Sequence, residues 1–153
     1  MLEGSFILLR QLGSIDLAPG EQVRFSIDAY RGFRYVSVRR YIETDGFSGA
    51  TRDGITLTPE IVRALAARLA TLPDDPQQVV PGTLGKFAKR PGVCVVARVG
   101  DFKGKRGLDL RQWQEETGWT KKGIWLPMAH WHELKELFRV ARAAVEEAPV
   151  DDF

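Results

Sequence analysis

The sequence predicts an α+β protein made of two tandem ββββα units. Three observations support this fold class. Part of the first half recurs in the second, strand-like alternation precedes a helical pattern in each half, and a proline-rich polar segment lies between them. With 153 residues, of which 44% are hydrophobic and 27% charged, the chain can bury one ordinary core or two small ones.

The repeat appears when the sequence is shifted by 72 residues, which lays YRGFRYVSVRRYIETDG at 30–46 over FKGKRGLDLRQWQEETG at 102–118. Five of these 17 positions are identical, and five more keep their chemistry. The next pair, Phe47 and Trp119, is aromatic in both copies, and after a gap of three residues TRDGITL matches TKKGIWL. Because chance similarity of this order and extent is improbable, we interpret the chain as a duplication.

The strands of each copy follow one plan. Period-2 alternation and β-branched residues predict the strands, and a basic residue followed by glycine, at Arg31–Gly32 and Lys103–Gly104, predicts the turn between two of them. A polar loop then leads to a short strand, GITL or GIWL. The strands expected before that loop are 6–13, 22–30 and 33–42 in the first copy, and 83–89, 93–101 and 105–114 in the second.

A helix closes each copy. Thr58 followed by Pro59 is typical of an N-cap and a first helical position, and the apolar residues that follow recur at helical spacing. The second helix is expected to start near Pro127 and to reach Glu147, with Trp131 on its apolar face.

These elements predict four parts of the chain: a first unit over 1–72, a linker over 73–82, a second unit over 83–145 and an acidic tail over 146–153. The tail, EEAPVDDF, holds four acids and no base, so the rest of the chain has 22 Lys and Arg against 16 Asp and Glu. A formal charge of about +6 on this body permits a polyanionic partner without requiring one.

Alternation gives each unit an uncovered sheet face that carries aromatic and basic residues. In the first copy Val38 faces the core, so Arg39 and Tyr41 lie on the opposite face. In the second copy Arg111 and Trp113 share that face. A face exposed only to water would favour Thr, Lys and Glu over Tyr and Trp.

Single-stranded nucleic acid explains this combination, because stacking of a base on an aromatic ring contributes roughly 1–3 kcal/mol and basic side chains follow the phosphates. The alternative is that the aromatic residues pack in the core or between the units, and that the basic residues are merely solvated. The candidate binding residues are Tyr30, Arg31, Arg34, Arg39, Tyr41, Phe47, Arg52, Phe102, Lys103, Lys105, Arg106, Arg111, Trp113, Trp119, Lys121 and Lys122.

The stretch DFKGK, followed by LDLR, an aromatic residue, a variable loop, KKGIWL and a Trp-bearing helix, resembles the transcriptional coactivator positive cofactor 4 family. The resemblance covers 93–140 and, more loosely, 22–70, so the chain looks like a tandem version. It implies a curved four-stranded antiparallel sheet with a C-terminal helix, normally a homodimer, that binds single-stranded DNA with little sequence preference. We therefore expect the two units to form an intramolecular pseudo-dimer.

The first copy departs from the family pattern at two cationic positions, where it has Phe33 and Asp53. We therefore expect the second copy to bind more tightly. In both copies the aromatic residue that closes the family's second strand is displaced, since Ile42 and Gln114 occupy its site. The resemblance implies stacking and phosphate-contacting roles for Tyr30, Arg31, Arg39 and Arg52 in the first copy, and for Phe102, Lys103, Lys105, Arg111, Lys121 and Lys122 in the second.

The acidic tail, which ends in Phe153, resembles the C-terminal tip of bacterial single-stranded DNA-binding proteins. That resemblance implies a protein partner that docks on the tail, whereas the alternative is an ordinary solvated acidic end. A further hypothesis is that the tail competes with DNA for the basic face.

No pattern predicts an enzyme, a cofactor or a metal site. The lone Cys94 lies in an apolar run and is expected to be a buried small hydrophobic residue. His130 and His132 lie two residues apart on a helix, so their side chains point to different sides.

We expect a non-enzymatic protein that binds single-stranded DNA in replication, repair or transcription and has no membrane segment. It would be cytoplasmic and nucleoid-associated in a bacterium, or nuclear in a eukaryote, as a monomeric pseudo-dimer or a homodimer. Two alternatives stay open. One is a transcription or architectural factor that binds duplex DNA or RNA, and the other is a protein–protein interaction module that acts through the helices and the tail.

Overall fold

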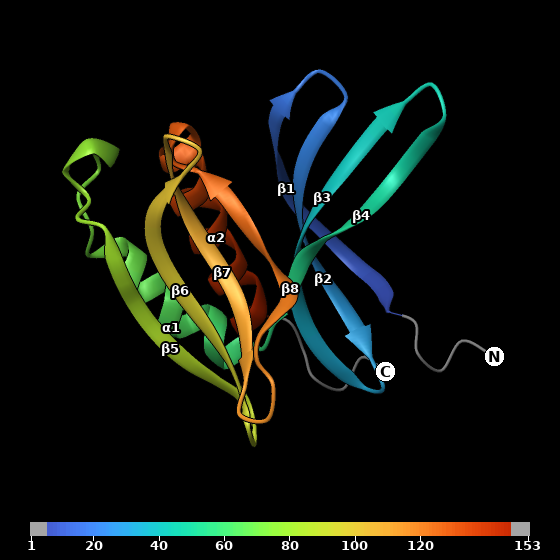
Figure 1. Ribbon diagram of the computed structural model, residues 1–153. Coiled ribbons are helices and arrows are strands. Elements are labelled where there is room, and N and C mark those ends of the chain that lie inside the picture. The colour runs from blue at the N-terminus through green and yellow to red at the C-terminus, as the bar shows by residue number, and fades with distance from the viewer. Residues whose placement is uncertain (1–5, 148–153) are drawn as a thin grey trace.

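Eight antiparallel strands form one curled sheet, and two helices lie against it (Figure 1). The structure, a computed structural model, describes residues 6–147. Four strands and a helix occur twice in succession, which confirms the predicted α+β fold of two tandem units. The elements of the first unit are β1 (Ile7–Ala18), β2 (Glu21–Tyr30), β3 (Phe33–Thr44), β4 (Phe47–Leu57) and α1 (Pro59–Ala70), and those of the second are β5 (Gly82–Arg90), β6 (Val93–Phe102), β7 (Lys105–Gln114), β8 (Gly118–Pro127) and α2 (Trp131–Glu147).

The two units meet in the middle of the sheet, whose strand order is β1-β2-β3-β4-β8-β7-β6-β5. Within the described residues, a single ladder pair joins β4 to β8, Gly54 with Gly123. A Cβ atom on Gly54 would lie 2.6 Å from the guanidinium carbon of Arg39, and one on Gly123 would lie 2.7 Å from that of Arg111. Glycine therefore lets an arginine of each unit lie against the backbone at the centre of the sheet.

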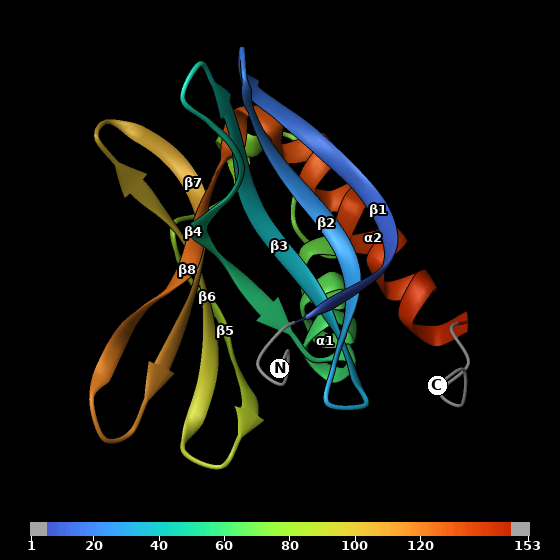
Figure 2. The same ribbon diagram turned by 90° about the vertical axis from the view of Figure 1, so that its right-hand side faces the viewer.

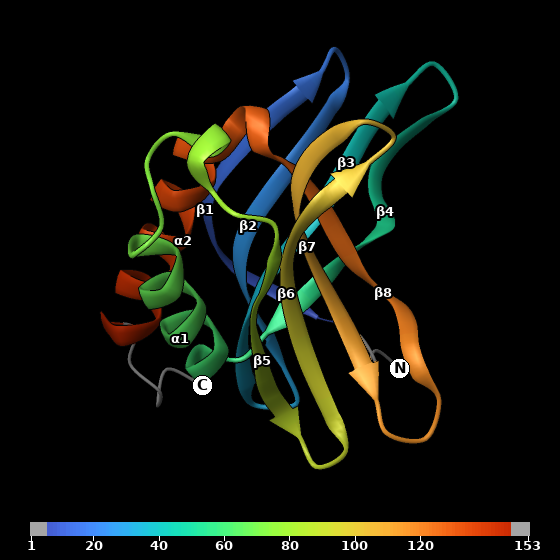
Figure 3. The same ribbon diagram turned by 60° about the vertical axis from the view of Figure 1, so that its left-hand side comes forward.

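The helices pack across the boundary between the units. Helix α2 contacts β1 and β2 of the first unit, and α1 contacts β5 of the second as well as β3 and β4 of its own. Figures 2 and 3 show the two helices side by side on the same side of the curled sheet. The ring of Phe25 on β2 meets that of Phe138 on α2 edge to face, with ring centres 5.1 Å apart. The units therefore share one core, and the predicted intramolecular pseudo-dimer is confirmed.

Both hairpin turns have the conformation that the sequence predicts. Arg31 and Gly32 have φ values of 52° and 82°, and Lys103 and Gly104 have 52° and 77°. Two successive residues at positive φ are typical of the tight turn whose twist matches that of the flanking strands. Each turn therefore presents its basic side chain at the tip of a hairpin.

The prediction of a polar loop before GITL and GIWL is wrong, because β4 already begins at Phe47 and β8 at Gly118. A bulge accommodates the polar residues in the ladder. The Thr51 hydroxyl donates to the carbonyl oxygen of Arg40 at 3.0 Å and accepts from the backbone N–H of Asp53 at 3.1 Å. Thr120 makes the same pair of hydrogen bonds in the second unit.

The helix signals are only partly correct. The Thr58 hydroxyl accepts the N–H of Ile61 at 3.2 Å and caps α1 as predicted. A short 3-10 turn, η2 (Met128–His130), separates Pro127 from α2, so the second helix begins later than predicted.

The segment between the units contains the 3-10 turn η1 (Pro76–Gln78), and β5 begins at the last residue of the expected linker. The acidic tail predicted over 146–153 overlaps the end of α2 by two residues, and 148–153 lie outside the described residues. Within residues 6–147, no helix is both long enough and apolar enough to cross a membrane.

Candidate nucleic-acid interface

The sheet face opposite the helices carries the predicted aromatic and basic side chains of the first unit. On β2, Phe25 and its neighbours at every second position are buried in the core, so Arg24 and Tyr30 point to the open face. On β3 the same alternation places Arg39 and Tyr41 on that face. The candidate residues of the first unit thus come from adjacent strands of one surface.

Cations lie over the aromatic rings of this face. The Arg24 guanidinium is 4.2 Å from the ring centre of Tyr41, and that of Arg31 is 5.3 Å from the ring centre of Tyr30. Phe6 also stacks on Tyr30, with ring centres 4.7 Å apart and an interplanar angle of 23°. Such clusters offer flat surfaces next to positive charge, which is the combination that a base and its phosphate require.

The second unit repeats this arrangement with different aromatic residues. Trp113 on β7 lies directly opposite Trp119 on β8, and the Arg98 guanidinium is 4.9 Å from the ring centre of Trp119. The ammonium group of Lys103 is 5.3 Å from the ring centre of Phe102, which is 57% exposed. Each unit therefore has aromatic platforms with adjacent cations.

Three of the predicted residues do not lie on the open face. Alternation places Arg34 and Arg106 on the helix side, and Arg106 forms an ion pair with Asp101 at 3.1 Å. Phe47 pairs with Thr44 near the hairpin turn. The sequence match of Phe47 with Trp119 is not preserved in the sheet, because three additional residues lengthen the β3–β4 hairpin and place Ala50 opposite Tyr41.

The remaining predicted cations are exposed around the face. Lys105 follows the turn of the β6–β7 hairpin. The bulges made by Thr51 and Thr120 set the positions of the cations that follow them. These cations are Arg52 on β4, and Lys121 and Lys122 on β8.

The two central arginines differ in their partners. The Arg39 guanidinium donates to the carbonyl oxygen of Thr51 at 3.0 Å. Arg111 also donates to a carbonyl oxygen, that of Lys121 at 3.4 Å, but in addition it forms an ion pair with Asp109 at 3.1 Å. Arg98 lies 3.6 Å from the other oxygen of the same carboxylate. The positive charge of the second face is therefore partly neutralised within the protein.

Sequence reasoning missed several residues of the interface. Arg24 and Arg98 occupy the open-face positions of β2 and β6, and strict alternation of those strands identifies them. Trp125 lies over Gly107, where a Cβ atom would approach the indole to 2.2 Å, and only the fold reveals that approach. Phe6 reaches Tyr30 from the N-terminal end of β1, far from the repeat in sequence.

Lys89 at the end of β5 joins the two units. Its ammonium group donates to the Thr56 hydroxyl at 2.8 Å, the Thr56 carbonyl oxygen at 2.9 Å and the Gln112 side-chain oxygen at 3.1 Å. Burial, followed by repulsion from Arg90 and Lys122, lowers the pKa of Lys89 to about 8. All three acceptors are neutral, so they do not compensate the charge with an opposite one.

This pKa predicts how Lys89 affects stability. Below pH 8 the lysine is charged in both the folded and the unfolded chain, and above its ordinary pKa of 10.5 it is neutral in both. Between these values the unfolded chain binds the additional proton, so the free energy of unfolding should rise with pH. Urea unfolding of the wild type and of Lys89→Met across this range should show the wild type gaining stability relative to the variant. A constant or falling difference would contradict this prediction.

Cys94 is half-buried, and the prediction of a buried residue is therefore wrong. It occupies an open-face position of β6 directly opposite Trp113, where the helices do not cover it. Within residues 6–147, no group of three His, Cys, Asp or Glu side chains is arranged to hold a metal ion.

The open face, the shared core and the repeated turns agree with a comparison of the chain with known families. No curated protein matches the sequence. The family described as Transcriptional Coactivator p15 (PC4) matches residues 17–67 and 95–137, one segment in each unit and more than half of the chain in total. The protein is a tandem-repeat member of the transcriptional coactivator p15 (PC4) family.

Proposed function

We propose that the protein binds single-stranded DNA across the open face of its sheet, largely independently of sequence, and acts in transcription, replication or repair. Membership of the p15 (PC4) family supports binding of single-stranded DNA and a role in transcription. The observation that carries the proposed mechanism is the repeated placement of a cation about 4–5 Å from an aromatic ring on one uncovered face. Bases stack on such rings while phosphates contact the cations.

The mechanism divides binding into two contributions. Stacking depends little on salt, whereas each neutralised phosphate of a single strand contributes about 0.7 to the slope of log affinity against log salt. A duplex hides its base faces and cannot use the aromatic rings in this way. The face therefore favours a single strand over a duplex.

Replacement of Lys103 by asparagine tests the phosphate contribution. Asparagine tolerates the positive φ of 52° at this turn, so the hairpin should be retained while the charge is lost. The salt slope for single-stranded DNA should fall by about 0.7, as measured by fluorescence anisotropy over a salt series. Arg142→Gln on the exposed surface of α2 is the matched control and should leave the slope unchanged. An unchanged slope in Lys103→Asn would exclude a phosphate contact at this turn.

A further inference from the structure

We infer that one groove, on the open face of the first unit and completed by cations of the second, is the primary site for the DNA strand. The inference rests on the proposed function and assigns the two faces unequal roles. It also reverses the expectation from the turn lysines that the second copy binds more tightly.

The groove has a volume of about 720 Å³ and takes its walls from both units. Tyr30, Tyr35 and Phe6 form an aromatic wall, in which Phe6 and Tyr35 meet edge to face with ring centres 5.9 Å apart. Among residues 6–147, six cations and no carboxylate line it. These cations are Arg31, Arg39 and Arg52 of the first unit, and Lys89, Arg90 and Lys122 of the second.

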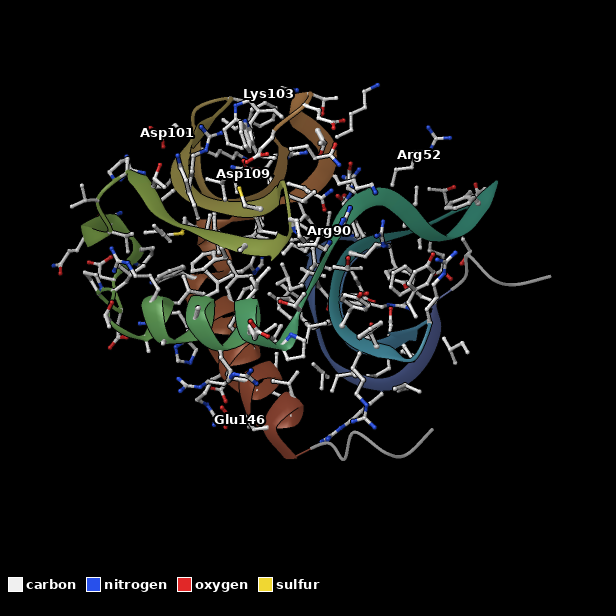
Figure 4. The ribbon with its side chains drawn as sticks, turned by 90° about the horizontal axis from the view of Figure 1, so that it is seen from below. Arg52, Arg90, Asp101, Lys103, Asp109 and Glu146 are labelled. Atoms are coloured by element: carbon white, nitrogen blue, oxygen red, sulfur yellow. The ribbon has the colours of Figure 1, made fainter. Side chains whose placement is uncertain are left out.

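The matching groove of the second unit, about 660 Å³, has a balanced lining. Its lining includes two cations, Arg98 and Arg111, and two acidic residues, Asp101 and Asp109. The carboxylate of Asp109 pairs with both of these cations, whereas that of Asp101 pairs with Arg106. Figure 4 shows Asp109 within the curled second half of the sheet, with Arg90 between the two halves. An incoming phosphate must therefore compete with Asp109 for Arg98 and Arg111 in this groove. In the first groove, no carboxylate of residues 6–147 forms an ion pair with Arg39, Lys89 or Lys122.

The two grooves differ in the residues that one unit contributes to the open face of the other. The ladders show which positions are equivalent, since β1 and β5 pair with β2 and β6 in the same register. At the positions where the second unit contributes three cations to the first groove, the first unit offers two apolar residues and an acid. These equivalent pairs are Lys89 and Leu17, Arg90 and Ala18, and Lys122 and Asp53.

Asp53 increases the difference, because it forms an ion pair with Arg40 at 2.6 Å. A second carboxylate, that of Glu21, lies 2.8 Å from the same guanidinium. The first unit therefore presents an ion-paired carboxylate, Asp53, at the position where the second unit presents Lys122. Burial is the main cause of the lowered pKa of Lys89, and repulsion from Arg90 and Lys122 adds to it, which agrees with the cations gathered in the first groove.

Two neighbouring lysines provide a matched test. Lys122 lines the first groove and Lys121 does not, although both are exposed residues of β8. With a fluorescein-labelled oligothymidylate, Lys122→Gln should weaken binding by about fivefold at 0.1 M salt and lower the salt slope by about 0.7. Lys121→Gln removes a cation that does not line this groove, so it should weaken binding by a smaller factor than Lys122→Gln.

The affinity for oligothymidylate should rise when the Asp109 carboxylate is removed from the second groove. Asp109→Asn removes the carboxylate from Arg98 and Arg111, so the second face gains two cations for phosphate and oligothymidylate should bind more tightly. Equal losses in Lys122→Gln and Lys121→Gln, or unchanged affinity in Asp109→Asn, would overturn the unequal roles while leaving single-stranded DNA binding intact. A wild-type protein that binds no oligothymidylate would instead refute the proposed function itself.

Discussion

Phe138→Ala is expected to lower the free energy of unfolding by about 3–5 kcal/mol, the usual range for truncating a buried aromatic residue. Phe138 lies on α2 of the second unit and is fully buried against Phe25 on β2 of the first. Because the ring belongs to a core shared by both units, its loss should destabilise the whole chain. Chemical denaturation followed by circular dichroism and by tryptophan fluorescence should give one transition that moves to lower denaturant.

Arg142→Ala is the control for this prediction, since it lies on the same helix but is exposed. Its effect should stay within about 0.5 kcal/mol. Two separate transitions, of which Phe138→Ala shifts only one, would show that the units are independent domains and would contradict the shared core.

Tyr30→Ala is expected to weaken binding of single-stranded DNA by about fivefold to 150-fold, which corresponds to the roughly 1–3 kcal/mol of one stacked base. Tyr30 also stacks on Phe6, so its removal affects two of the three rings of the aromatic wall. The salt slope should change little, because no phosphate contact is removed. Fluorescence anisotropy over a salt series measures the affinity and the slope together.

Tyr30→Phe keeps the ring and should restore most of the affinity lost in Tyr30→Ala. If both variants bind like the wild type, Tyr30 has only a packing role. If Tyr30→Phe is as weak as Tyr30→Ala, the hydroxyl rather than the ring carries the contact.

Local signals in the sequence predict much of this fold. The basic residue and glycine of each hairpin and the Thr58–Pro59 cap act over a few residues, and each is reproduced. The ladders retain the repeat, since Val23 pairs with Arg40 as Val95 pairs with Gln112. These features are predictable because short-range geometry determines them.

Other features depend on which segments meet in space. The apolar faces of the helices are visible in the sequence, yet packing on either unit would bury them equally, so the exchange of helices between units is not predictable from periodicity. The same holds for Lys89 and Trp125, whose partners come from strands far away in the sequence. The predicted equivalence of Phe47 and Trp119 is wrong, because a sequence alignment does not show where within the hairpin the three additional residues lie.

The asymmetry of the two grooves also depends on tertiary contacts. A count of the turn lysines favours the second unit, because Lys103 and Lys105 occupy the positions that Arg31 and Phe33 occupy in the first unit. The fold shows instead that the second unit contributes cations to the face of the first unit, and that Asp109 neutralises cations on its own face. Neither effect follows from the composition of a single hairpin.

The central claim is that the open face binds a single strand by stacking and phosphate contacts. Its most direct test is fluorescence anisotropy of the full chain with one labelled sequence, presented as single-stranded DNA, as duplex DNA and as RNA over a salt series. We predict that single-stranded DNA binds more tightly than the duplex and that log affinity falls linearly with log salt. Absence of binding at low salt, or a duplex bound as tightly as the single strand, would contradict the claim.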